Sequence, residues 1–368
     1  MSEENSCNVE DITLSCADGI HIAAQRWTLQ DGHPSNGTTS TPAAEQRILC
    51  LHGWLDNCRS YYRLAPLILA QLSQQVQKEG GEVVNKTTIV AIDFPGHGLS
   101  SHKSIDGPIT VLSENAYYVA EVVAQLGWDT NSSSSNSSLG AKSDNESQEQ
   151  QPKFTLIGHS MGCAVSIVYT ACYPENVSNL ILLEGFGPRP RPDKDITQSI
   201  RKHITTRMKS IRKPKPKSIF PNVDTAVQAR CMTATTFPGK QYISTEAAYE
   251  LVLRATAKPA DGKGEDNDTR VQFVHDNRLY WPSLQYMTTE QNITFYKDIR
   301  EAEHIDVCIL TGKDGWPFDL TKENNHMKVA LDTLQPKVTK ELPGSHHFHM
   351  DPESCEEVAR SVVEFLTA

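Results

Sequence analysis

The chain has 368 residues, and it lacks the features that would place a protein in a membrane or outside the cell. No apolar run reaches the roughly 18 residues that a membrane-spanning helix needs. The first residues are polar and acidic, whereas a secretion signal has a basic start and an apolar core. The last three residues, Leu-Thr-Ala, are not the peroxisomal Ser-Lys-Leu tail. From these absences we expect a soluble, cytoplasmic protein.

The chain also has fewer basic than acidic side chains, and its formal net charge is -10. A general nucleic-acid binder is usually basic, so we expect no nucleic-acid partner. The nine cysteines are an odd number, and several of them stand inside apolar segments. In an intracellular chain they are most simply buried thiols.

Apolar segments of strand length alternate with helical patterns along most of the chain. Such runs are typical of strands covered on both faces, and their alternation with helices favours right-handed parallel crossovers. We therefore predict an α/β fold with a mostly parallel central sheet and helices on both faces, after an N-terminal hairpin at Asp18-Gly19. The predicted strands are 47–51, 88–93, 154–157, 180–183, 305–310 and 338–342. The predicted core helices are 61–76, 113–126, one ending at Tyr173, 326–334 and 352–366.

Two segments interrupt this alternation of strands and helices. Residues 129–152 are rich in Ser and Asn with almost no apolar side chain, which predicts a disordered insertion. Residues 186–300 contain Pro-rich turns and helical patterns, which predicts a helical lid over the carboxyl ends of the strands. The core then consists of residues 1–185 and 301–368.

A Gly-x-Ser-x-Gly pattern stands at the centre of the predicted sheet. Residues 158–162 (Gly-His-Ser-Met-Gly) follow an apolar strand and precede an apolar run of helical length. This context predicts a nucleophile elbow with Ser160 at the apex of a tight turn. Gly158 and Gly162 leave room for neighbouring backbone to pass close by.

A serine nucleophile needs a base and an acid that orients the base. His346 follows the last strand and a Gly-Ser turn, so we prefer it to His347 and His349 as the base. No cysteine or carboxylate stands beside these histidines at ligand spacing, so we expect no metal.

For the acid we favour Asp314, which lies just past the next-to-last strand. Glu184 is the alternative, because it ends the strand after the elbow and reaches the same edge of the sheet. Asp319 is a third candidate. The backbone N–H groups of Trp54 and Met161 are the expected oxyanion-hole donors. We expect Asp56 and Asn57 to cap the next helix.

Four segments together resemble the α/β-hydrolase fold superfamily. The full sequences of these segments resemble its serine hydrolase-like protein group. They are 52–57 (His-Gly-Trp-Leu-Asp-Asn), 93–102, 158–162 and 343–346. The resemblance covers most of the chain outside 129–152 and implies a Ser-acid-His hydrolase with Ser160 and His346 in those roles. The family places its Asp three residues after the strand-end glycine. Asp314 is only two residues after Gly312, which keeps Glu184 open.

We predict a cofactor-free serine hydrolase that cleaves a carboxylic ester or thioester of a small or acyl substrate through an acyl-enzyme. Ser160 argues against the dehalogenases and epoxide hydrolases that use aspartate. Two alternatives stay open: a catalytically silent ligand-binding protein, and cofactor-free lyase or haloperoxidase chemistry on the same triad.

Residues 189–217 contain eleven Lys or Arg and two Asp. This segment is either a solvated lid face or a site of weak contact with an anionic membrane or an anionic acyl carrier.

Overall fold

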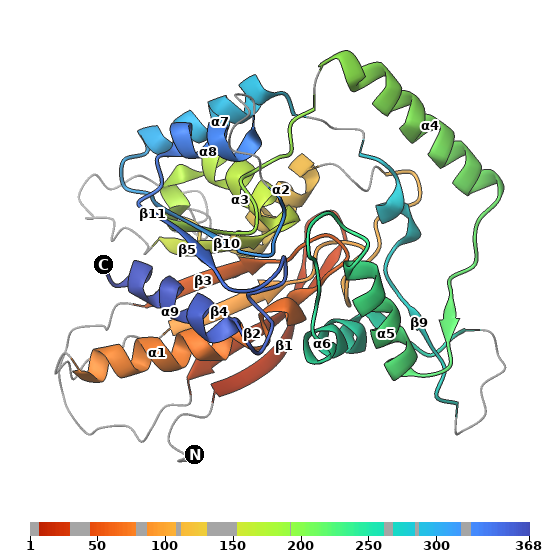
Figure 1. The fold of residues 1–368 in the computed structure, drawn as a ribbon, viewed down its shortest axis with the longest axis horizontal. Coiled ribbons are helices and arrows are strands. Elements are labelled where there is room, and N and C mark those ends of the chain that lie inside the picture. The colour runs from red at the N-terminus through yellow and green to blue at the C-terminus, as the bar shows by residue number, and fades with distance from the viewer. Residues whose placement is uncertain are drawn as a thin grey trace, which may run out of the picture.

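The computed structural model describes residues 7–29, 45–78, 87–107, 112–130, 153–191, 193–260, 268–283, 287–317 and 325–368. Eight strands form the main sheet in the order β1-β2-β4-β3-β5-β6-β10-β11 (Figure 1). The first two, β1 (Cys7–Ser15) and β2 (His21–Leu29), pair antiparallel, as the predicted hairpin requires. β2 also pairs antiparallel with β4, and the other neighbours are parallel.

Five of the six parallel strands match apolar runs of the sequence, and β4 and β5 are buried along their whole length. They are β3 (Gln46–Leu51), β4 (Thr87–Ile92), β5 (Phe154–His159), β6 (Val177–Leu183), β10 (Asp306–Gly312) and β11 (Val338–Leu342). The prediction of a mostly parallel sheet is confirmed. Since their carboxyl ends meet at one edge of the sheet, the residues that follow these strands lie near one another.

Helices cover both faces of the sheet. One face is covered by α1 (Leu64–Lys78) and α9 (Cys355–Leu366), whose buried residues share a core with β3 and β4. The other face is covered by four helices. These are α2 (Leu112–Gln125), α3 (Met161–Cys172), α7 (Thr289–Glu301) and α8 (His326–Leu334).

The lid contains three helices and a small antiparallel sheet (Figure 1). The helices are α4 (Ile196–Arg212), α5 (Val223–Ala234) and α6 (Thr245–Ala255), and the short strands are β7 (Ile219–Phe220), β8 (Thr256–Ala257) and β9 (Val271–Phe273). The predicted lid boundary at residue 300 is wrong, because α7 packs on the core. Tyr296 and Ile299 of α7 are fully buried in the cluster that contains α3.

Most of the predicted disordered insertion, from residue 131 to 152, lies outside the described residues. Among the helices that the structure describes, none is long and apolar enough to cross a bilayer.

Candidate active site

Ser160 occupies a sharp turn between β5 and α3. Its backbone has a φ of 53° and a ψ of -111°, a conformation that is costly for a residue with a side chain and that functional sites often keep. Close packing explains both glycines of the motif. A Cβ at Gly162 would lie 2.1 Å from the carbonyl oxygen of Leu51, and one at Gly158 would lie 2.7 Å from the backbone nitrogen of Cys163. Only glycine fits these two positions.

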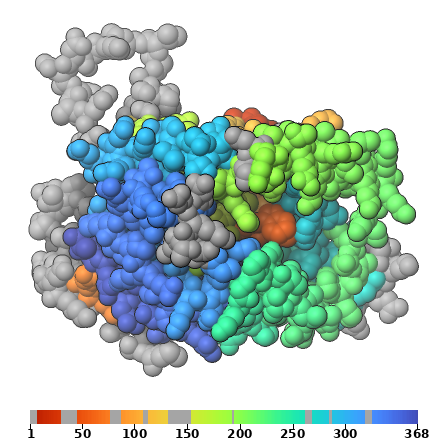
Figure 2. Space-filling model, turned by 45° about the horizontal axis from the view of Figure 1, so that its top comes forward, coloured from red at the N-terminus to blue at the C-terminus, as the bar shows by residue number. Residues whose placement is uncertain are grey.

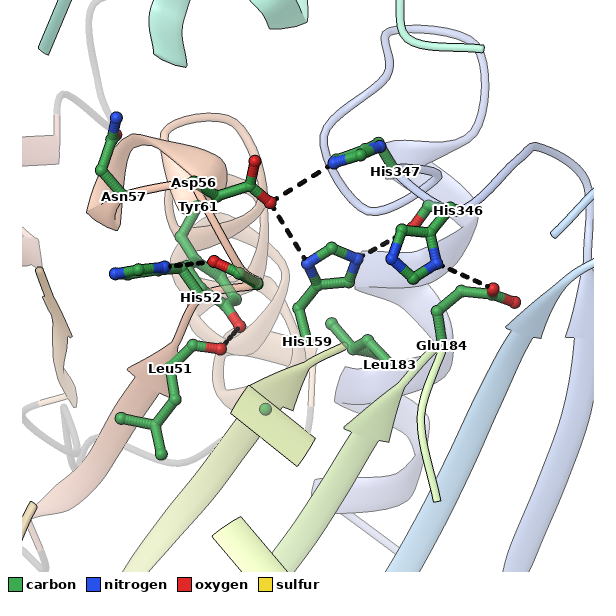
Figure 3. Close-up of polar contacts among 12 residues, drawn as sticks. Leu51, His52, Asp56, Asn57, Tyr61, His159, Leu183, Glu184, His346 and His347 are labelled. Carbon is green, nitrogen blue, oxygen red and sulfur yellow. Dashed lines mark hydrogen bonds and ion pairs between the residues drawn. The ribbon is translucent and has the colours of Figure 1, made fainter. Parts of the chain in front are cut away.

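Glu184, at the end of β6, is the carboxylate that contacts His346 (Figure 3). Its Oε2 lies 3.1 Å from Nδ1 of the imidazole, and its side chain is buried. The backbone N–H groups of Gly312 and Trp316 donate to the two carboxylate oxygens at 2.6 Å and 3.2 Å. Glu184 also has a positive φ of 53°. The structure therefore corrects the prediction that Asp314 orients His346.

The turn after β10 explains why Asp314 does not take this place. The backbone N–H of Asp314 donates to the carbonyl oxygen of Gly344 at 2.9 Å, which ties the turn to the loop that carries His346. The turn also wraps closely around Glu184, since a Cβ at Gly315 would lie 2.3 Å from its Oε1. The end of β10 and this turn supply backbone N–H donors to the carboxylate of Glu184. Asp319 lies outside the described residues.

Hydrogen bonds hold the His346 loop on both sides. The backbone N–H of His346 donates to Oε1 of Gln241 in the lid at 3.1 Å. Nε2 of His159 lies 2.9 Å from the carbonyl oxygen of His346 and so donates to it. His159 is fully buried, and burial together with the neighbouring imidazoles holds its pKa well below the usual value. A neutral His159 therefore positions the backbone of the candidate base.

The two rival histidines face other partners. His347 turns to Asp56, with 3.3 Å between Nε2 and Oδ2. His349 is fully buried beside His159, with ring centroids 4.1 Å apart, and neither of its ring nitrogens has a hydrogen-bond partner in the described part of the chain. His346 is therefore the member of the trio that pairs with Glu184.

Asp56 joins three segments that are distant in sequence. Besides His347, it pairs with Arg230 of α5 at 2.8 Å, whereas the unprotonated Nδ1 of His159 lies 3.7 Å from its Oδ2 without a hydrogen bond. Burial alone raises the pKa of Asp56, but the attraction of His347 and Arg230 outweighs it and holds the pKa well below the usual value. Of the two expected caps only Asn57 acts as one, since its Oδ1 accepts from the N–H of Arg59 at the start of the short helix Cys58–Tyr61.

The loop after β3 presents the N–H of Trp54. His52 accepts the N–H of Phe94 at Nε2, so its Nδ1 must be the protonated nitrogen that donates to the carbonyl oxygen of Gly53 at 2.6 Å. In a trans peptide the next N–H points to the opposite side, away from His52. Met161 is the first residue of α3, so its N–H precedes the intrahelical hydrogen bonds. No acceptor for either N–H occurs among the described residues.

A cavity of about 1180 Å³ connects these groups with the lid. Ser160 and His346 line it together with Trp54. Figure 2 shows a hollow whose floor has the orange colour of the segment after β3, bordered by green lid atoms. Within the described residues, no group of three or more His, Cys, Asp or Glu side chains is arranged to hold a metal.

Comparison with known proteins places this architecture. A family model described as "Alpha/beta hydrolase family" matches residues 48–361. The chain belongs to the alpha/beta hydrolase family. A serine hydrolase-like protein of Danio rerio is 26% identical over 330 residues, covering 88% of this chain and 82% of that protein. Serine hydrolase-like protein 2 of Homo sapiens is 26% identical over 361 residues, covering 94% and 90%.

A solved structure agrees with this assignment. A hypothetical protein of Pseudomonas aeruginosa PAO1 has a TM-score of 0.69 and 26% identity, with 98% of this chain and 100% of that one covered. The predicted resemblance to the alpha/beta hydrolase superfamily and to its serine hydrolase-like group is confirmed.

Two features of this alpha/beta hydrolase escaped the sequence reasoning. Asp56 and Arg230 are 174 positions apart, and no spacing rule connects them. The second feature is the pair of N–H donors to Glu184. The short spacing between Gly312 and Asp314 was a signal for these donors. It marks a turn that differs from the one in which the family places its Asp three residues after the strand-end glycine.

Proposed function

We propose that the protein is a serine hydrolase that cleaves a carboxylic ester or thioester, with Ser160, His346 and Glu184 as nucleophile, base and acid. The observation that carries the proposal is the 3.1 Å contact between Glu184 Oε2 and His346 Nδ1, with His346 lining the same cavity as Ser160. A carboxylate on Nδ1 leaves Nε2 as the nitrogen that accepts the serine proton.

The proposed reaction has two halves. Ser160 Oγ attacks the carbonyl carbon while its proton moves to Nε2 of His346, and the negative charge on the carbonyl oxygen is met by the N–H groups of Trp54 and Met161. The proton then passes from His346 to the departing alcohol or thiol, which leaves an acyl ester on Ser160. Water repeats the sequence, since His346 takes its proton and returns it to Ser160 Oγ as the acid is released.

Two features of the cavity support an acyl substrate. A volume of about 1180 Å³ exceeds what a small ester fills, and aromatic side chains of the lid, among them Tyr280 and Trp281, line it. Each buried methylene contributes about 0.8 kcal/mol, so kcat/KM rises with acyl length until the chain fills the available space.

The test combines covalent labelling with a substrate series. A fluorophosphonate probe labels the wild-type protein, and Ser160→Ala abolishes the labelling. With p-nitrophenyl esters and acyl thioesters of increasing length, the same substitution lowers turnover by about 10³-fold or more. A folded wild-type protein that neither reacts with the probe nor turns over any member of the series is a ligand-binding protein and not a hydrolase. Turnover that releases no carboxylic acid indicates lyase or haloperoxidase chemistry.

A further inference from the structure

Helix α4 and the residues after it carry concentrated positive charge. Residues 196–217 contain eight Lys or Arg and no Asp or Glu, within a chain whose net charge is -10. None of the basic side chains from 196 to 215 forms an ion pair with any residue that the structure describes. Figure 1 shows α4 standing at the rim of the molecule, away from the main sheet.

The orientation of α4 is the reverse of an ordinary surface helix. Its apolar side chains recur at intervals of three and four residues and so share one face. That face is open to solvent, with exposed fractions from 39% to 63%. The residues of the stripe are Ile196, Ile200, Ile204, Met208 and Ile211.

Polar residues make the contacts between α4 and the rest of the protein. Ser199 and His203 are its buried residues. Ser199 Oγ accepts from Arg191 at 2.9 Å, and Nδ1 of His203 contacts the carbonyl oxygen of Pro282 at 2.5 Å. Since the isoleucines take no part in this packing, the fold of the chain does not explain them.

The rest of the lid is anchored differently. Arg254 of α6 pairs with the buried Asp93 at 2.8 Å, and Arg230 of α5 pairs with Asp56. The apolar side chains on the facing sides of α5 and α6 are buried in a cluster that includes Met350 of the core. In the described part of the lid, α5 and α6 together expose three large apolar side chains (Met232, Tyr249 and Leu253), whereas α4 alone exposes a stripe of five.

We propose that the exposed face of α4 docks on an anionic membrane surface. A helix that combines an aliphatic stripe with Lys and Arg is suited to lie in the interface, with its apolar side chains at the boundary between headgroups and acyl chains. Arg201 and Arg212 lie beside the stripe, and residues 213–217 (Lys-Pro-Lys-Pro-Lys) extend the positive charge. The acidic remainder of the chain is repelled by such a surface, so charge complementarity selects α4 as the docking side.

The helix that docks also borders the cavity, through residues outside the stripe. Thr205, Lys209 and Lys213 line the cavity that contains Ser160, and they belong to the same helix or follow it directly. The docking itself does not depend on the proposed hydrolase activity, and it is measured without any substrate.

The experiment is co-sedimentation of the full chain with vesicles of phosphatidylcholine alone or with about 30% phosphatidylserine. We expect binding to the anionic vesicles only, and weaker binding as the salt concentration is raised from about 0.1 M to about 0.5 M. The key variant combines Ile200→Ser, Ile204→Ser and Ile211→Ser, which keeps every charge. We expect the partition coefficient of this variant to fall by about tenfold or more, because aliphatic burial is lost.

A control variant removes apolar side chains of greater exposure outside α4. Ile105→Ser with Met232→Ser replaces residues that are 83% and 70% exposed, and we expect it to bind like the wild type. Circular dichroism and thermal unfolding check that the variants fold. If the triple variant does not fold, Ile211→Ser alone, at the most exposed position of the stripe, replaces it.

Three results would overturn the proposal. They are equal binding to neutral and anionic vesicles, undiminished binding of a folded isoleucine variant, and a dimer in light scattering that the isoleucine substitutions dissociate. The last result would assign the stripe to a second copy of the chain. Loss of esterase activity alone has no bearing on docking, so the two proposals fail separately.

Discussion

Two carboxylate–histidine pairs lie at the same edge of the sheet, and adjacent residues of one loop provide their imidazoles. Glu184 pairs with His346 at 3.1 Å, and Asp56 pairs with His347 at 3.3 Å (Figure 3). Both carboxylates are buried. The two pairs differ in what else holds the carboxylate.

Neutral backbone N–H groups hold Glu184, whereas the guanidinium of Arg230 holds Asp56. A carboxylate without a cationic partner retains its charge to stabilise an imidazolium, but Asp56 already has a positive partner. Both imidazoles line the cavity that contains Ser160, so the partners of the two carboxylates are what distinguish the pairs. The first pair is therefore suited to proton transfer, whereas the second holds together the loop after β3, the loop that carries His346 and His347, and α5.

The difference between the two pairs is tested most strongly by replacing each histidine separately. We expect His346→Gln to lower kcat for an ester that the wild type cleaves by about 10⁴-fold, because the proton acceptor is lost. His347→Gln leaves the proton path intact, so we expect less than about a tenfold loss. Unfolding curves control for stability. Equal losses in two folded variants would remove the distinction between the pairs.

The second pair is tested through stability. In Arg230→Met the buried Asp56 loses its cationic partner, and we expect the free energy of unfolding in urea to fall by about 3 kcal/mol. Adding Asp56→Asn removes the uncompensated charge, so the double variant should recover part of this loss. A single variant as stable as the wild type would show that Arg230 does not anchor the lid.

The imidazoles around the second pair predict a dependence on pH. Burial, together with the nearby His347, holds the pKa of His349 well below its usual value, so the folded state keeps it neutral. The unfolded chain binds a proton there below about pH 6.5, so stability falls as the solution is acidified through that value. Between about pH 7.5 and 5.5 we expect His349→Leu to lose less stability than the wild type, by on the order of 1 kcal/mol. An unchanged pH dependence would contradict a neutral His349.

Local sequence signals were sufficient for most of the fold. Apolar runs marked five of the six parallel strands, with β11 (Val-Thr-Lys-Glu-Leu) as the exception, and Gly158 and Gly162 marked the elbow, because continuous burial and a tight turn restrict the residue types that fit. The lid boundary was misplaced because the amphipathic pattern of α7 does not reveal whether its apolar face packs on the lid or on the core.

The acid was not decidable from the sequence. Glu184 and Asp314 follow β6 and β10, which are neighbours in the sheet with Leu183 opposite Leu310. Either carboxylate could reach the same imidazole from these positions. Which carboxylate reaches His346 depends on the turn that wraps around Glu184. That turn is held by two hydrogen bonds whose partners are separated in sequence by 128 and by 132 positions.

The most direct test of the Ser160-His346-Glu184 triad compares the two carboxylates in matched variants. Fluorophosphonate labelling rates are measured for the wild type, Glu184→Gln and Asp314→Asn, each checked for folding. We predict that Glu184→Gln slows labelling by about 10²-fold or more, whereas Asp314→Asn stays within about threefold of the wild type. Slow labelling of Asp314→Asn together with normal labelling of Glu184→Gln would contradict the account.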